Sequence, residues 1–141
     1  MTTLTADHFN TLSQGKLAGH LGLVITQLQP AEVRGTLTVA PQLMATNGFL
    51  HAGSVVTLAD TCCGYGCVAN LPQGASSFTT VELKSNHLGT AREGHVDCVA
   101  KPAHLGRTTQ VWDAVVTHRE TGKTIALFRC TQMLLYPKSP G

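Results

Sequence analysis

The chain has 141 residues, a length that suits one domain with a hydrophobic core and leaves little room for a second. Charged residues make up only 13% of it, and the net charge is +2. A nucleic-acid binder needs many Lys and Arg side chains to neutralise phosphates, so this composition excludes that class. The low charge fraction also predicts that other subunits cover part of the surface.

The first ten residues hold no cationic start followed by an apolar run, so we expect no signal peptide. Asp60 and several glycines interrupt the longest apolar segment, so we expect no membrane span and a cytoplasmic protein. An odd number of cysteines without a CxxC pair favours small buried side chains over disulfides or a zinc site. The five are Cys62, Cys63, Cys67, Cys98 and Cys130.

The first third of the chain predicts a helix followed by two strands. Residues 6–19 suit a short helix and a loop, with Asp7 as the N-cap and Gly15 as the terminator. From Gly22 to Val39 apolar and polar residues alternate on either side of Pro30, which indicates a hairpin with one buried face. The apolar members of its second strand are Val33, Gly35, Leu37 and Val39.

A long apolar segment from Gly53 to Asn70 is typical of a buried helix, because apolar residues lie on nearly every side of it. Ser54 is predicted to cap its start, and Leu71-Pro72 to end it. Strands then return at about 77–88, 94–102, 107–118 and 123–135.

This order of elements predicts an α+β fold in which a curved antiparallel sheet wraps around one long central helix. We expect a single domain over residues 1–141, with a core at about 19–136, a short N-terminal helix within 1–18 and a disordered tail at 137–141. The open edges of such a sheet invite pairing between subunits, and so predict an oligomer.

Asp60 is the residue that points most directly to chemistry. A carboxylate within an apolar helix is unfavourable unless it is paired, hydrogen-bonded or functional. Small residues on its helical face leave space beside it for a substrate or another chain. These face neighbours are Gly53, Val56, Thr57 and Gly64. The residues alone also leave open a structural role, in which Asp60 braces a neighbouring loop.

The segment Asn47-Gly48-Phe49-Leu50-His51-Ala52-Gly53 leads into this helix and predicts a second part of the site. A glycine-containing turn at a helix start presents free backbone N–H groups, with the positive end of the helix dipole behind them. Such donors suit the oxyanion that forms when a thioester carbonyl is attacked. His51 either polarises that carbonyl or is a structural, hydrogen-bonded histidine.

The stretch N-G-F-L-H-A-G-S-V-V-T-L-A-D resembles the signature of hotdog-fold acyl-CoA thioesterases of the phenylacetate-degradation type, within the 4HBT thioesterase superfamily. The acidic residue falls nine positions after the histidine, as in that family. Segments 80–84, 104–107 and 122–126 resemble its later strand motifs, so the resemblance covers about residues 19–135.

The resemblance implies hydrolysis of an aryl- or medium-chain acyl-CoA, with a place in phenylacetic acid degradation. It implies no metal and no separate cofactor, because coenzyme A is part of the substrate. It also implies a homodimer, or a homotetramer built as a dimer of dimers.

Carried over by position, the resemblance makes Asp60 the general base or the nucleophile. The backbone N–H of Ala52, where the family usually has glycine, becomes the oxyanion donor, with Gly53 beside it. Thr80 matches a hydroxyl residue that positions the attacking water.

The family also carries an amide side chain six positions before the histidine. Ala45 stands there in this chain, and Asn47 is the nearest substitute. For the phosphates of coenzyme A we expect contacts from residues of the later strands. They are Arg107, His104 and Lys84. For Arg107, an ordinary solvated surface position is the alternative.

Two other functions stay open at this point. A hotdog dehydratase or hydratase also uses a histidine and a helical carboxylate, but its histidine belongs to an H-F-P loop that His51-Ala52-Gly53 does not resemble. A non-catalytic acyl-CoA-binding protein of this fold would not need to keep the buried Asp60. Release of free thiol from acyl-CoAs separates both from a thioesterase.

Overall fold

The computed structural model describes residues 4–138. Within this range the helices are α1 (Ala6–Leu12), α2 (Leu17–His20) and α3 (Ala52–Ala69), with a short 3₁₀ turn at Pro41–Leu43. The strands are β1 (Val24–Gln29), β2 (Glu32–Thr38), β3 (Ser77–His87), β4 (His95–Leu105), β5 (Thr109–His118) and β6 (Thr124–Leu135). Of the tail predicted at 137–141, residues 139–141 lie outside the described residues.

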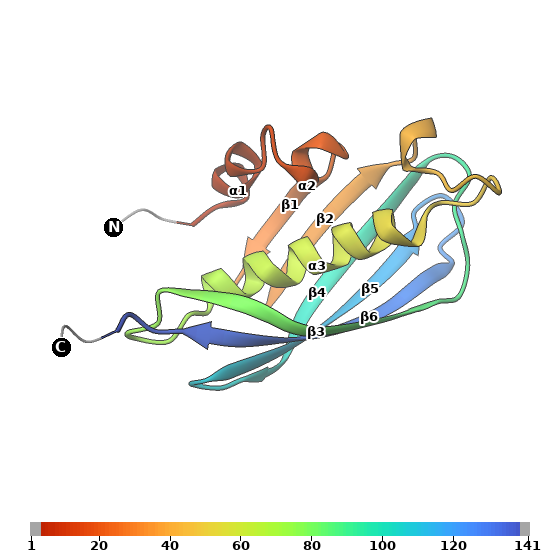
Figure 1. Cartoon of the computed structure of the whole chain (residues 1–141). Coiled ribbons are helices and arrows are strands. Elements are labelled where there is room, and N and C mark those ends of the chain that lie inside the picture. Colours follow the sequence, from red (N-terminus) through yellow and green to blue (C-terminus); the bar gives the residue numbers. More distant parts are fainter. Residues whose placement is uncertain (1–3, 139–141) are drawn as a thin grey trace.

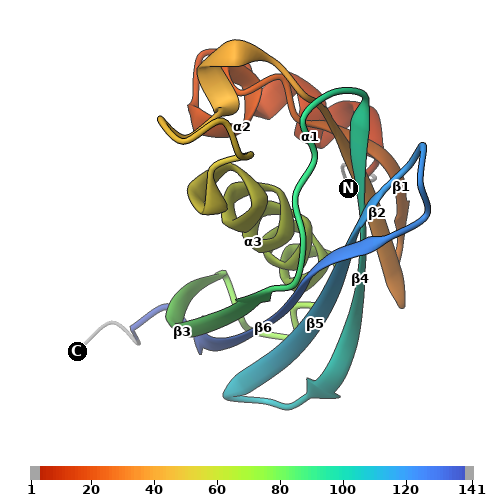
Figure 2. The same ribbon diagram turned by 90° about the vertical axis from the view of Figure 1, so that its right-hand side faces the viewer.

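All six strands form one antiparallel sheet in the order β1-β2-β4-β5-β6-β3. β3 follows α3 in the chain but pairs with β6 at the far edge, so the sheet passes around the helix (Figure 1). Figure 2 looks nearly along α3 and shows it lying in the curve of the sheet. The predicted architecture, a curved antiparallel sheet around one long helix, is confirmed.

The core forms because alternate residues of each strand point toward α3. The predicted apolar face of β2 is buried at Val33 and Leu37, and the inward residues of β4 and β6 are buried in the same way. Helix and sheet approach closely where glycine replaces a side chain. A Cβ at Gly35 would lie 2.7 Å from the Cys62 sulfur, and one at Gly66 would lie 2.4 Å from the Trp112 ring.

Two predicted helix caps are wrong. Thr5 caps α1 in place of Asp7, because its hydroxyl accepts the His8 N–H at 3.1 Å. His51 caps α3, while Ser54 lies inside the helix and donates to the Leu43 carbonyl at 2.8 Å. α1 also ends at Leu12, before the predicted terminator Gly15.

The five cysteines are free, and all are buried, as predicted. Four of them belong to the core between α3 and the sheet, namely Cys62, Cys63, Cys98 and Cys130. No helix within residues 4–138 is long and apolar enough to cross a membrane.

Candidate active site

The first turn of α3 offers one unoccupied backbone donor. The ring Nδ1 of His51 accepts the Gly53 N–H at 2.7 Å, and the His51 carbonyl accepts the N–H groups of Ser54 and Val55 at 2.9 and 3.3 Å. The Ala52 N–H has no acceptor among residues 4–138, because the first N–H of a helix has no intrahelical partner. With the positive end of the helix dipole behind it, this N–H suits an oxyanion.

The His51 side chain provides a second hydrogen-bond donor, in addition to the Ala52 N–H. Because Nδ1 accepts a hydrogen bond, the neutral ring carries its proton on Nε2. The residue is exposed, and its Nε2 has no partner among the described residues. His51 therefore orders the helix start through one nitrogen and can donate to a carbonyl oxygen through the other.

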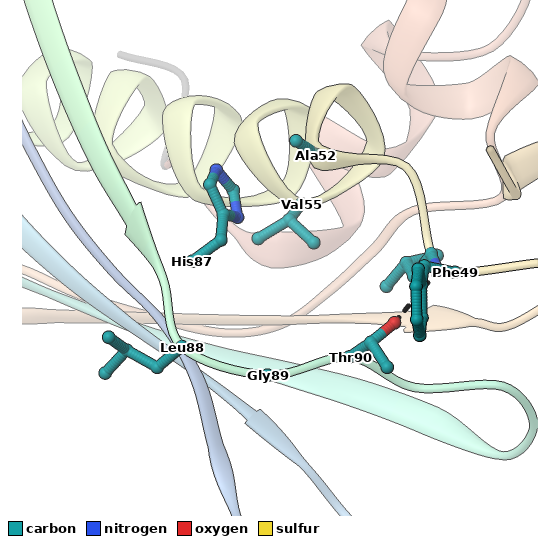
Figure 3. Close-up of a pocket in the computed structure, with 8 residues that line it drawn as sticks. Phe49, Ala52, Val55, His87, Leu88, Gly89 and Thr90 are labelled. Atoms are coloured by element: carbon teal, nitrogen blue, oxygen red, sulfur yellow. Dashed lines mark hydrogen bonds between the residues drawn. The ribbon is translucent and has the colours of Figure 1, made fainter. Parts of the chain in front are cut away.

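A pocket of about 390 Å³ opens at this turn. The side chains around it come from the loop before α3, from α3 itself and from the end of β3. They include Phe49, Ala52, Val55, His87, Leu88 and Thr90. Figure 3 shows the His87 imidazole pointing toward the part of α3 that carries Ala52 and Val55. A hydrogen bond connects the loop before α3 to the chain after β3, since the Thr90 hydroxyl accepts the Leu50 N–H at 3.0 Å.

Asp60 faces a different cavity, of about 570 Å³, between α3 and the N-terminal helices. Its walls are mainly apolar and come from the α1–α2 region, from α3 and from β3. The larger apolar side chains among them are Phe9, Leu12, Leu17, Tyr65, Val68 and Phe78. The Phe9 ring stacks on the Tyr65 ring with 4.1 Å between centroids, which holds α1 against α3. None of the residues around the Ala52 pocket also lines this cavity.

The environment of Asp60 favours its neutral form. Its Oδ1 is buried and has no hydrogen-bond partner among the described residues, and desolvation raises the pKa of the carboxyl above its ordinary value of 3.8. Asp97 and Asp113 show the opposite behaviour, because hydrogen bonds from Arg119 and Arg129 lower their pKa values. A half-buried, unpaired carboxyl with a raised pKa in a cavity is suited to take a proton.

The raised pKa of Asp60 predicts two pH effects. If ionised Asp60 is the base, kcat/KM should fall on acidification through a limb that lies above the 3.8 of an ordinary aspartate. The folded state binds the proton more tightly than the unfolded state, so the free energy of unfolding should decrease as pH rises from 3.8 through the folded pKa. Urea unfolding of wild type and Asp60→Asn at several pH values checks this, because the variant should lose that part of the decrease.

Three of the other predicted site residues lie on β3 or in the loop before α3. Thr80 lies on β3, opposite Gln132 and on the same face of the strand as Phe78, so it faces the helix side of the sheet. Asn47 shapes the entering loop, since its Oδ1 accepts the Phe49 N–H at 3.2 Å. Lys84 pairs in register with Arg129 on the outer face of the sheet, away from α3.

His104 and Arg107 lie near the opposite end of α3 from Ala52. They belong to the end of β4 and the turn before β5, both exposed. β5 starts beside the last turn of α3, because the Gln110 amide donates to the Asn70 carbonyl at 3.0 Å. Neither residue lines the Ala52 pocket or the Asp60 cavity of its own chain.

Several residues that line the two cavities are absent from the sequence-based prediction. Phe78 had a usable signal, because strand alternation places it on the same face as Thr80. Phe9 and His87 had none, since nothing local shows that α1 packs on α3 or that the end of β3 turns toward Ala52. Within residues 4–138, no three His, Cys, Asp or Glu side chains come together in a way that could hold a metal ion.

The fold, the Ala52 pocket and the Asp60 cavity together define a class of protein. Its members are hotdog proteins with an acidic residue on the central helix and a free N–H at the helix start. Comparison with known proteins agrees, because the profile of the Thioesterase superfamily matches residues 47–125. The chain belongs to that superfamily and is a thioester hydrolase.

Individual relatives are similar over nearly their whole length. The chain is 30% identical to the 1,4-dihydroxy-2-naphthoyl-CoA hydrolase of Escherichia coli, over 94% of this chain and 96% of that one. It is 29% identical to the proofreading thioesterase EntH of Cronobacter sakazakii, over 94% and 95%. A thioesterase structure from Haemophilus influenzae superposes with a TM-score of 0.88 at 29% identity, covering 96% of this chain and 93% of the other. The phenylacetate-degradation type stays a prediction.

Proposed function

We propose that the protein hydrolyses an aryl- or medium-chain acyl-CoA thioester, with the acyl group in the cavity beside Asp60. The observation that carries this proposal is an unpaired carboxylate with a raised pKa that faces an apolar cavity of about 570 Å³. Apolar walls favour an apolar acyl group, and the stacked Phe9–Tyr65 pair suits a flat ring. Coenzyme A thioesters as substrates fit the cytoplasmic location expected from the sequence.

In the proposed reaction, Asp60 takes a proton from a water molecule, and the resulting hydroxide attacks the thioester carbon. The carbonyl oxygen becomes an oxyanion that accepts the Ala52 N–H and the His51 Nε2–H. The intermediate then collapses, the carbon–sulfur bond breaks, and coenzyme A leaves as the thiolate. Direct attack by the Asp60 carboxylate, with water cleaving the resulting anhydride, uses the same groups.

One chain cannot bring these groups together. Asp60 lies eight positions after Ala52, which at 1.5 Å per residue is about 12 Å along the helix. The N–H groups of a helix start point outward, away from the helix body, so an oxyanion bound there lies farther still from Asp60. A base and an oxyanion donor must each lie about 3 Å from their atoms of one reacting centre. The site therefore needs Asp60 from one subunit and Ala52 from another.

The sheet edge at β3 supports such a pairing. Within residues 4–138, β3 bonds only to β6, which leaves its other edge open to a second subunit, and Val81 and Leu83 are 52% and 42% exposed. A two-fold dimer repeats each contact, so it would form two equal sites. We propose a homodimer on this basis, and a homotetramer as its dimer of dimers.

Arg92 adds a group for the coenzyme. Its guanidinium lies over the Phe49 ring at 4.8 Å from the centroid, and Phe49 lines the Ala52 pocket. A cation at this pocket suits a phosphate of coenzyme A. His104, Arg107 and Lys84 keep their proposed role only if a partner subunit brings the coenzyme to them.

Mixing two inactive variants tests the shared site. Asp60→Asn and Ala52→Pro should each be nearly inactive, but random mixed dimers contain one intact site, so activity should return to about a quarter of the wild-type value. The measurement is turnover after the two variants are unfolded together and refolded. No recovery, in mixtures shown to contain mixed dimers, would place both groups in one chain and contradict the shared site.

The test of the function itself is release of free CoA thiol from a panel of benzoyl-, phenylacetyl-, hexanoyl- and acetyl-CoA. A thioesterase releases thiol and free acid from at least one member. A hydratase or dehydratase would change only enoyl or hydroxyacyl substrates and release no thiol. A non-catalytic binder would bind acyl-CoA without turnover.

A further inference from the structure

Asn10 connects the N-terminal helix to the opposite edge of the sheet. Its side-chain amide donates to the Ile25 carbonyl at 2.9 Å, and its Oδ1 accepts the Ile25 N–H at 2.8 Å. β1 is an edge strand, and its register with β2 shifts between Ile25 and Gln27. Asn10 thus bonds both backbone groups of one edge residue, as a neighbouring strand would.

The neighbours of Asn10 form the wall opposite Asp60. His8, Phe9, Leu12 and Ser13 all line the Asp60 cavity, on either side of Asn10 in the chain. α1 has only seven residues, too few to be stable alone, so its position depends on its contacts. Two of these contacts reach other elements in different directions: Phe9 stacks on Tyr65 of α3, and Asn10 bonds to the edge of β1.

We propose that Asn10 is a positioning residue that sets the width of the acyl-binding cavity, and so determines which acyl groups bind. This inference rests on the proposed function, because it takes the Asp60 cavity as the acyl site. Asn10 does not line the cavity, so it acts through the placement of α1. Without its two hydrogen bonds α1 can move away from α3, and a bulky acyl group loses contact on one side.

The test compares a ligand that fills the cavity with one that does not. Phenacyl-CoA, an aromatic thioether that cannot be hydrolysed, is titrated against wild type and Asn10→Ala, and free coenzyme A is the second ligand. We expect Kd for phenacyl-CoA to rise about tenfold, as expected for loss of about 1.4 kcal/mol of binding, and Kd for coenzyme A to stay within about twofold. KM should likewise rise for benzoyl-CoA more than for acetyl-CoA.

Asn70→Ala is the matched control. The Asn70 amide also makes two hydrogen bonds to the backbone, to the carbonyls of Pro30 at 2.6 Å and Gly66 at 2.8 Å, but Asn70 is the C-cap of α3 and neither it nor its two partners line the Asp60 cavity. A general loss of stability would change binding in both variants alike. The proposal instead expects the ratio of Kd for phenacyl-CoA to Kd for coenzyme A to change only in Asn10→Ala. Where Asn10→Ala does not fold, Asn10→Ser is measured by the same criterion.

The outcomes are separable. Suppose that wild type hydrolyses benzoyl-CoA, but that the ratio of Kd for phenacyl-CoA to Kd for coenzyme A is the same in wild type and in the folded Asn10 variant. This result overturns the role of Asn10 and leaves the proposed function intact. Wild type that neither hydrolyses any thioester nor binds phenacyl-CoA overturns both.

Discussion

Replacing Asp60 by asparagine should lower kcat by about 10²–10⁴, the usual contribution of a general base. Asparagine has nearly the same shape as aspartate but cannot accept the proton of the attacking water. The fold should survive, because the buried Oδ1 of Asp60 has no ion pair or hydrogen bond with any residue of 4–138 that the change could remove. Initial rates of CoA thiol release at saturating substrate measure the effect.

The control for this variant is Asp113→Asn. Asp113 lies on β5 and bonds to the Arg129 guanidinium at 2.6 and 2.8 Å, on the outer face of the sheet. The same chemical change there should leave kcat within about twofold, as is usual for a surface substitution. Turnover of Asp60→Asn near the wild-type rate would remove Asp60 from the mechanism.

Replacing Ala52 by proline should lower kcat by about 10²–10³, because it deletes the one N–H of the α3 first turn that has no acceptor among the described residues. Ala52 is the first residue of the helix, a position where proline is favoured. His51 before it has φ −62° and ψ 134°, which suits a residue that precedes proline. The backbone can therefore accept the change, and circular dichroism should show an intact fold.

Ala52→Gly is the companion variant. It restores the residue usual in the family, keeps the N–H and should leave kcat within a few-fold. A folded Ala52→Pro protein with wild-type turnover would assign the oxyanion to another donor. The Gly53 N–H already bonds to His51 Nδ1, so His51 Nε2–H would be the next group to test.

Much of the fold could be predicted because its signals are periodic. The alternation of Val33, Gly35 and Leu37 and the apolar segment from Gly53 to Asn70 depend on local spacing, and both elements form close to the predicted bounds. The predicted N-caps were wrong because several polar residues near each helix start can accept the free N–H groups. The path of the chain into each helix makes Thr5 and His51 the N-caps, and local sequence does not determine that path.

The site could be predicted only in part, for a different reason. Asp60 stands out because a carboxylate is unusual in an apolar helix. The cavity it faces depends on tertiary contacts, chiefly Phe9 on Tyr65, between segments more than fifty residues apart. The distance from Asp60 to Ala52 follows from the helix alone, yet the dimer that we propose from it involves a second copy of the chain.

The buried cysteines also determine how the protein can be studied. Desolvation raises the pKa of Cys67 to about 12. Hydrogen bonds with Cys130 and Cys62, followed by burial, raise the pKa values of Cys63 and Cys98 well above the ordinary range. All five thiols are buried, and aromatic disulfide reagents react quickly only with accessible thiolates, so the folded enzyme should add little background when such a reagent is used to count released coenzyme A. In denaturant all five sulfhydryls become reactive. Without denaturant, the slow rate at which the buried sulfhydryls are labelled reports how often the helix opens from the sheet.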